Sequence, residues 1–253
     1  MAQYQYLTAR QVKELAKLNT TRARKATGLF LAEGEHMVEE SIRERHAKYL
    51  LCADNCVDKY QKLLDGKLPI YLLSPASLSK ISDTKTPQGI FAVCDIPKPT
   101  NHLGKKVIAL NALQDPGNVG TILRTMDAVG FDTLIVDEKT ADPYSSKAMR
   151  ASMGAIFRIS IVQSQSLVDE IKKLKDYNIL AGALEGKSLY NTQMTGKPIC
   201  ILIGNEGKGL DQELLNLTDS LIKIPIPGQA ESLNAAIAAA VFMYEHLKQE
   251  QNI

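Results

Sequence analysis

The stretch Val107-Ile-Ala-Leu-Asn-Ala-Leu-Gln-Asp-Pro-Gly-Asn-Val-Gly-Thr-Ile-Leu-Arg124 holds the clearest structural signal in this chain of 253 residues. An apolar run at 107–110 predicts a buried strand, and the polar turn at 115–118 is typical of a chain about to enter a helix, which we expect over 118–129. Ligands of open parallel sheets bind beyond the carboxyl ends of the strands. The turn is therefore a candidate site, with an ordinary strand-to-helix turn as the alternative interpretation.

Similar apolar runs recur through the second half of the chain. They lie at 133–136, 159–162, 179–183 and 199–203. Continuous apolar runs of this kind are expected of parallel strands that helices cover on both faces. We expect these helices at 145–151, at 166–175 and at 233–249, the last one opened by Ser232. The sequence thus predicts an α/β fold with a mostly parallel sheet over 105–253.

The first half also alternates between helices and strands, over roughly 95 residues. The expected helices are one from Thr8 to about Leu18, then 35–45, 57–64 and a short one after Ser74; the expected strands are 28–32, 49–53, 70–73 and 90–94. The segment Ile96-Pro-Lys-Pro-Thr-Asn-His-Leu-Gly104 has two prolines and no periodicity, which is typical of an extended linker. We therefore expect a small α/β domain over 1–95, a linker over 96–104 and a second domain over 105–253.

Two further segments place glycine and polar residues after apolar runs. Ile201-Leu-Ile-Gly-Asn-Glu-Gly-Lys-Gly-Leu210 spaces its glycines as GxxGxG, which matches neither a dinucleotide fingerprint nor a phosphate-binding P-loop. It predicts a turn where the backbone can approach a ligand closely, with Glu206 in its middle. In Ile224-Pro-Ile-Pro-Gly-Gln-Ala-Glu-Ser-Leu-Asn234, prolines fix an extended loop before the last helix. Taken alone, this third segment is no more than a helix cap.

Composition excludes several classes of protein. Apolar residues make up 45% and charged residues 23% of the chain, as in ordinary globular proteins. The longest apolar run, Ala235 to Met243, is too short to cross a bilayer, and the first ten residues do not resemble a signal peptide. The four cysteines form no CxxC pair and have no histidine at ligand spacing. We expect a soluble cytoplasmic protein with reduced thiols, no metal and no membrane partner.

Basic side chains gather near the N-terminus. The first 25 residues contain a single acid, Glu14, and six bases, namely Arg10, Lys13, Lys17, Arg22, Arg24 and Lys25. A basic cluster suits a phosphate backbone, although many such clusters are only solvated surface.

Together, the motifs DPxNxGxIxRT (from Asp115), GNEGxGL (from Gly204) and IPIxGxxxSLNxxxA (from Ile224) resemble those of the SPOUT-class RNA ribose 2′-O-methyltransferases, the SpoU or TrmH family. The segments 141–144 and 150–155 resemble that family too. The resemblance covers residues 107–247. The stretch from Arg22 to Glu33 resembles the substrate-binding domain of two-domain ribosomal RNA methyltransferases, a small α/β fold shared with some ribosomal proteins. The resemblance implies a deep trefoil knot, S-adenosylmethionine as methyl donor and a homodimer.

The resemblance also implies which residues act. Arg124 would contact the ribose and a neighbouring phosphate. It would serve as the base or, because a guanidinium keeps its proton at neutral pH, would fix the phosphate and polarise the hydroxyl. The other catalytic positions would be Asn118, Glu206, Ser232 and Asn234. The methyl donor would be lined by Gly204, Asn205, Gly207, Ile224, Ile226 and Leu233. RNA would be bound by Arg22, Arg24, Lys25 and Arg150.

The extra N-terminal domain favours ribosomal RNA, 23S above all, over transfer RNA, because transfer-RNA enzymes of this family usually carry only short flanking helices. Transfer RNA remains the alternative substrate. A non-catalytic RNA-binding factor of ribosome assembly is the alternative from a different class of protein. The presence of Arg124, Glu206, Ser232 and Asn234 argues against it.

Overall fold

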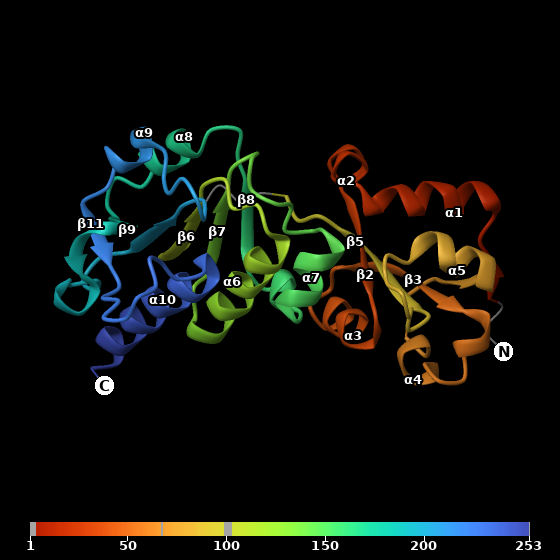
Figure 1. Ribbon diagram of the computed structural model, residues 1–253. Helices are drawn as coiled ribbons and strands as arrows, with labels where there is room; N and C mark the ends of the chain where they lie inside the picture. Colours follow the sequence, from red (N-terminus) through yellow and green to blue (C-terminus); the bar gives the residue numbers. More distant parts are fainter. Residues whose placement is uncertain (1–3, 67, 99–102, 253) are drawn as a thin grey trace. The chain divides into compact units, whose positions relative to one another are not determined.

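The computed structural model describes residues 4–66, 68–98 and 103–252. The chain divides into two compact units, one formed by Met1–Pro97 with Asp142–Phe157 and the other by Lys98–Ala141 with Arg158–Ile253 (Figure 1). Part of the expected linker, 99–102, lies outside the described residues. The placement of Asp142–Phe157 in the first unit differs from the expected division of the chain, and the contacts described below explain it.

The first unit contains a five-stranded sheet in the order β1-β4-β3-β5-β2. The strands are β1 (Gln5–Tyr6), β2 (Leu29–Glu33), β3 (Ala47–Ala53), β4 (Ile70–Leu73) and β5 (Ile90–Asp95). β1, β4 and β3 run parallel, whereas β5 is antiparallel to both of its neighbours. The helices are α1 (Ala9–Ala16), α2 (Thr21–Thr27), α3 (Glu35–Arg43), α4 (Gln61–Leu64), α5 (Pro75–Ile81) and α7 (Ser146–Ser152).

Local sequence explains where these helices begin. Thr8 caps α1 in a capping box with Gln11, and Ser74 caps α5 with Pro75 in its first turn. α1 and α5 bury Val12, Ile81 and neighbouring side chains against the sheet. The expected helix at 57–64 is shorter than predicted, since only α4 is helical in that stretch.

The second unit contains a six-stranded sheet in the order β11-β9-β10-β6-β7-β8, with every neighbouring pair parallel. The strands are β6 (Lys106–Leu110), β7 (Thr133–Val136), β8 (Ser160–Gln163), β9 (Asn178–Ser188), β10 (Ile199–Ile203) and β11 (Ser220–Lys223). The helices are α6 (Pro116–Val129), α8 (Leu167–Lys172), α9 (Gln212–Leu215) and α10 (Ala235–Gln251). Short 3-10 turns lie at Lys17–Asn19, Asp54–Cys56, Ala155–Phe157 and Leu189–Asn191. The predicted α/β class and the parallel sheet are confirmed.

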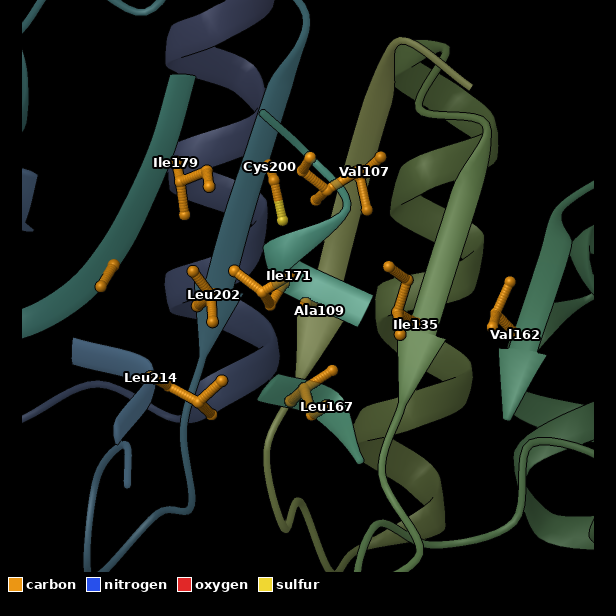
Figure 2. Close-up of a cluster of buried hydrophobic side chains, with 12 residues drawn as sticks. Val107, Ala109, Ile135, Val162, Leu167, Ile171, Ile179, Cys200, Leu202 and Leu214 are labelled. Atoms are coloured by element: carbon orange, nitrogen blue, oxygen red, sulfur yellow. The ribbon is translucent and has the colours of Figure 1, made fainter. Parts of the chain in front are cut away.

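Helices cover both faces of this sheet. Val107, Ile135 and Leu202 point from β6, β7 and β10 toward Leu167 and Ile171 of α8, while α6 and α10 lie behind the sheet (Figure 2). Because both faces are covered, the central strands are mostly apolar, and β10 (Ile-Cys-Ile-Leu-Ile) is buried along its whole length. The edge formed by the carboxyl ends of the strands is left for polar loops.

None of the helices within the described ranges is both long and apolar enough to pass through a membrane. Over the same ranges, no cluster of three or more His, Cys, Asp or Glu side chains is arranged to bind a metal ion.

The cysteines give a direct test of the packing. Cys52, Cys94 and Cys200 are buried and free, whereas Cys56 is partly exposed. Burial raises the pKa of the Cys52 and Cys94 thiols to about 12 and also raises that of Cys200. Since the thiolate is the reactive form, we expect Ellman's reagent to modify one thiol quickly in the native protein and all four in denaturant. Cys56→Ser should remove the fast phase; a fast phase that persists in this variant would contradict the described packing.

Candidate active site

Three loops meet where parallel strands end. The loop at 111–115 follows β6, the loop at 137–140 follows β7, and the loop at 204–211 follows β10. β6 lies between β10 and β7 in the sheet, so their carboxyl ends share one edge. This edge carries most of the predicted site residues.

α6 positions two of these residues. Asp115 caps the helix by accepting a hydrogen bond from the Gly117 N–H (3.0 Å), with Pro116 at the first position and Gly130 ending the helix at φ +75°. Asn118 therefore lies in the first helical turn, at the edge of the sheet. Arg124 lies further along the same helix.

Asn118 joins the three sequence motifs. Its Nδ2 donates to Oε1 of Glu206 in the glycine loop (2.9 Å), and its Oδ1 accepts from Nδ2 of Asn234 before α10 (3.1 Å). Residues separated by 88 and 116 positions in the chain are thus in direct contact. This geometry supports the prediction that Asn118, Glu206 and Asn234 belong to one site.

The glycine loop, residues 204–211, is a tight turn. At Gly204 it has room only for glycine. Asn205 and Gly209 exchange backbone hydrogen bonds, both of 2.9 Å. A Cβ atom on Gly204 would lie 2.3 Å from the backbone carbon of Gly209, so any side chain there would displace the turn. The Asn205 amide accepts from the Gly207 and Lys208 N–H groups and donates to the Ala112 carbonyl oxygen. The side chain of Asn205 therefore builds the loop, whose residues 206–209 are exposed.

The entry to α10 differs from the prediction. Asn234 caps the helix, because its Oδ1 accepts from the N–H groups of Ala236 (2.9 Å) and Ile237 (3.3 Å). Ser232 was the expected opening residue, but it lies two residues before this cap and is exposed. Its hydroxyl is consequently available to a substrate.

Arg124 is exposed on α6. Within the described ranges, no residue forms a hydrogen bond or ion pair with its guanidinium. Glu206 binds Asn118 and not Arg124. A free guanidinium with five donors on the site helix is suited to bind an external phosphate.

The expected donor-lining residues of the third motif combine apolar character with partial exposure. Ile224 and Ile226 are partly exposed, and Leu233 is 38% exposed. Apolar side chains that remain accessible beside a glycine loop can cover a flat heterocycle such as adenine.

The expected RNA-binding residues lie in the first unit and fall into two groups. Arg22, Lys25 and Arg150 are exposed. Arg24 is a correction: its guanidinium pairs with Asp142 at 2.7 Å, and the two side chains are only 4% and 7% exposed. It also donates to the Leu18 carbonyl oxygen (2.7 Å). Arg24 therefore attaches residues 142–157 to the first unit, and we do not retain it as an RNA contact.

Further contacts bind the same segment within the first unit. Tyr144 packs its ring against Phe30 with the centroids 5.0 Å apart, and Phe157 lies on the other side at 6.0 Å. Nε2 of His46 hydrogen-bonds to the Phe157 carbonyl oxygen (3.0 Å). These contacts explain why residues 142–157 pack with the first unit, although the chain on both sides of them belongs to the second unit.

A polar network in the loops beyond β6, β7 and β10 escaped the sequence interpretation. It consists of Asn111, Ala112, Asp137, Thr140 and Asp211. Asn111 and Asp137 each follow directly after a buried strand. That position was the signal that could have identified them.

Comparison with known proteins gives a consistent result. Residues 105–244 match the SpoU rRNA methylase family, and residues 9–92 match the MRM3-like substrate binding domain. The chain is 37% identical, over 98% of its length and all of the relative's, to the 23S rRNA (guanosine(2553)-2′-O)-methyltransferase RlmP of Bacillus subtilis.

Two solved structures extend the comparison. An AdoMet-bound rRNA methyltransferase from Sinorhizobium meliloti is 28% identical with a TM-score of 0.83, over 97% of both chains. The SpoU methyltransferase AviRb of Streptomyces viridochromogenes, in complex with AdoMet, is 24% identical and shares the fold with a TM-score of 0.85, over 97% of this chain and 99% of its own.

Proposed function

The chain belongs to the SpoU rRNA methylase family, and from this premise we propose its target nucleotide and the roles of its site residues. It is an RNA methyltransferase that uses S-adenosylmethionine to methylate a ribose 2′-hydroxyl in ribosomal RNA. The proposed target is the 23S guanosine equivalent to position 2553 in the name of the Bacillus relative, because the similarity to that relative extends over both domains. The observation that carries the mechanism is the contact of Asn118 with Glu206 and Asn234, on the helix that holds the free Arg124.

The residues present fit S-adenosylmethionine. The exposed glycine loop at 206–209 suits the polar edge of an adenine or ribose, and the accessible side chains of Ile224, Ile226 and Leu233 suit its flat apolar face. When bound, this donor supplies an electrophilic methyl group on a sulfonium. Gly204 and Asn205 would fix the shape of the loop that receives it.

Arg124 would bind the RNA phosphate and orient the 2′-hydroxyl. Its guanidinium stays charged at neutral pH, so it can hold a phosphate through paired donors and polarise the neighbouring oxygen. Asn118, held on both sides, would keep the start of α6 in place, and the free Ser232 hydroxyl would contact the substrate. As the new C–O bond forms, the C–S bond of the donor breaks and the hydroxyl proton passes to water or a phosphate oxygen. Alignment of the two reactants supplies much of the rate.

We propose that 1–95 is the RNA-binding domain, 96–104 a linker and 105–253 the catalytic domain, with Asp142–Phe157 of the last packed in the first unit. The match of 9–92 to a substrate binding domain supports this assignment. Arg22 and Lys25 on α2 and Arg150 on α7 are exposed cations that phosphates can reach. Because ribosomal RNA is the substrate, we place the enzyme in the cytoplasm.

The proposal predicts label in one ribosomal RNA nucleotide. Methyl-labelled S-adenosylmethionine is offered with unmethylated 23S RNA, 16S RNA and total transfer RNA in separate reactions. We expect label in 23S RNA alone, in an alkali-resistant linkage at one guanosine, and none with Arg124→Ala. Label confined to transfer RNA would contradict the substrate. Failure of the wild-type protein to bind the donor would favour the non-catalytic assembly factor instead.

We propose that the chain forms a homodimer through α10. Ile237 and Tyr244, seven residues apart on this helix, share a face and are 52% and 54% exposed, with Leu233 one turn before them. Accessible apolar side chains grouped on one helix mark an interaction surface. The resemblance to homodimeric family members supports a second copy as the partner.

Ile237→Lys should convert the dimer into a monomer, because a charge placed in an apolar interface must be desolvated without a partner. Light scattering after gel filtration would measure the mass. Tyr6→Lys is the matched control, since Tyr6 is 57% exposed on β1, which belongs to the other unit. A wild-type mass of one chain, or an unchanged mass in Ile237→Lys, would contradict the proposed interface.

We also propose that the second unit contains the trefoil knot of the family. The order β9-β10-β6 inserts a late strand between two earlier ones, and the loop after β10 packs against the loop after β6 through Asn205 and Ala112. An experimental structure traced from Lys106 to Gln251 would test the threading.

A further inference from the structure

Asp137 has a place in the site that neither the motifs nor the mechanism above explains. It directly follows β7, and both of its carboxylate oxygens accept hydrogen bonds from the neighbouring loops. The Ala112 N–H lies 3.1 Å from Oδ1 and 3.0 Å from Oδ2, and Nδ2 of Asn111 donates to Oδ2 (2.9 Å). The Thr140 N–H (2.8 Å) and hydroxyl (2.7 Å) donate to Oδ1. A single carboxylate thus organises the loops after two strands.

The residue that Asp137 holds is in an unfavourable conformation. Ala112 has a φ of +56°, in the left-handed region that side-chain-bearing residues rarely adopt. Its N–H is bound by Asp137, and its carbonyl oxygen accepts from Nδ2 of Asn205 (2.9 Å). A strained residue persists only where its surroundings hold it in place, and such residues gather at functional sites.

The same network reaches the glycine loop by a second route. Asn111, 2% exposed, donates from Nδ2 to Oδ2 of Asp211 (3.0 Å), and its Oδ1 accepts from the Asp211 N–H (2.9 Å). Asp137 and Asp211 therefore bind the same amide group from opposite sides. The loops after β6, β7 and β10 are joined into one polar assembly.

We propose that Asp137 is a positioning residue for methyl transfer. Its carboxylate holds the Ala112 turn, which fixes the start of α6 and so the positions of Asn118 and Arg124 relative to the glycine loop. An error of about 1 Å in the alignment of two reactants can cost about 100-fold in rate. The inference rests on the proposed function, because its measure is methyl transfer to ribosomal RNA.

Asp132 provides a matched control at the other end of the same sheet. Its Oδ2 accepts from the N–H groups of Lys105 (3.1 Å) and Lys106 (3.4 Å), and its Oδ1 accepts from the Thr133 hydroxyl (2.8 Å). Asp132→Asn and Asp137→Asn each turn one acceptor oxygen into a donor. At Asp137 this donor faces a backbone N–H group in either orientation of the amide, whereas at Asp132 it can face the Thr133 hydroxyl. Both changes disturb the fold, but only Asp137 adjoins the site.

The test compares kcat, the KM for RNA, the Kd for S-adenosylmethionine and Tm in the two variants and the wild type. We expect Asp137→Asn to lower kcat about 30-fold or more, with the donor Kd changed less than about threefold, at a temperature where circular dichroism shows a folded protein. Asp132→Asn should lower Tm but keep kcat within about twofold of the wild type. Equal losses of kcat in the two variants would overturn the positioning role, as would an Asp137→Asn variant with wild-type kcat.

A second variant keeps the inference testable if Asp137→Asn does not fold. Thr140→Val removes the hydroxyl that donates to the carboxylate and accepts from the Leu113 N–H (3.2 Å), and it should lower kcat several-fold; an unchanged kcat would contradict the inference. If the wild-type protein binds the donor but methylates no ribosomal RNA, the proposed function itself is contradicted. This outcome differs from a loss of activity in the Asp137 variant alone.

Discussion

Replacing Arg124 with alanine should abolish measurable methyl transfer while the protein stays folded. Arg124 is exposed, and in the described part of the chain its guanidinium has no partner whose loss would destabilise the fold. We expect a free energy of unfolding within about 0.5 kcal/mol of the wild type. The kcat should fall roughly 10³-fold, because electrostatic stabilisation of the reacting groups is lost. Single-turnover transfer to 23S RNA and equilibrium unfolding in urea would measure the two quantities.

The conservative variant separates charge from geometry. Arg124→Lys keeps the positive charge but loses the planar pair of donors, so we expect a loss of roughly 10²-fold in kcat. Binding of S-adenosylmethionine should stay within about threefold of the wild type in both variants, as should all properties of the exposed control Lys172→Ala. A near-normal rate for Arg124→Lys would show that charge alone is needed. A near-normal rate for Arg124→Ala would remove Arg124 from the reaction.

Replacing Arg24 should have the largest effect on stability. Its ion pair with Asp142 is almost fully buried, and a further hydrogen bond joins it to the Leu18 carbonyl oxygen. Breaking a buried pair leaves an uncompensated charge and costs about 3–5 kcal/mol. We expect Arg24→Met to reduce the free energy of unfolding by that amount. Because the chain has no tryptophan, far-ultraviolet circular dichroism is a suitable signal.

Arg22, two residues earlier on the same helix, gives the opposite pattern. It is exposed, so Arg22→Met should change stability by less than about 0.5 kcal/mol. Loss of a phosphate contact should instead weaken RNA binding. The slope of the logarithm of the binding constant against the logarithm of salt concentration should fall in magnitude by about one. Arg24→Met should leave RNA binding unchanged at temperatures where the variant is folded. Identical effects of the two substitutions on stability would contradict the burial of Arg24.

Local signals allowed much of the catalytic unit to be predicted. The strand before Asn111 and the helix between Asp115 and Gly130 follow from an apolar run, a cap with proline and a terminal glycine, and the structure confirms both. The meeting of the first two motifs at one sheet edge also follows, because both come directly after predicted strands and parallel strands end on the same side. The order of the motifs along the chain therefore indicated which distant segments meet, which no single residue indicates.

Features set by long-range contacts could not be predicted. Arg24 reads as one more basic residue, since nothing near it reveals that Asp142, 118 positions away, will bury it. β11 was missed because only two of its four residues, Leu221 and Ile222, are apolar, and its pairing with β9 shifts register between these two residues. Ser232 and Asn234 are both good helix caps, and only the contact between Asn234 and Asn118 decides between them.

The location of Asp142–Phe157 limits how this enzyme can be taken apart. By chain order the segment belongs with the catalytic half. Its Asp142 nevertheless pairs with Arg24, and its Tyr144 and Phe157 rings pack against Phe30, all within the first unit. A fragment that starts after the linker would expose Tyr144 and Phe157 and remove the Arg24 guanidinium from Asp142. The two halves are therefore poor candidates for exchange as independent modules, and a recombinant chimera would keep its solubility only if this segment and its docking surface were transferred together.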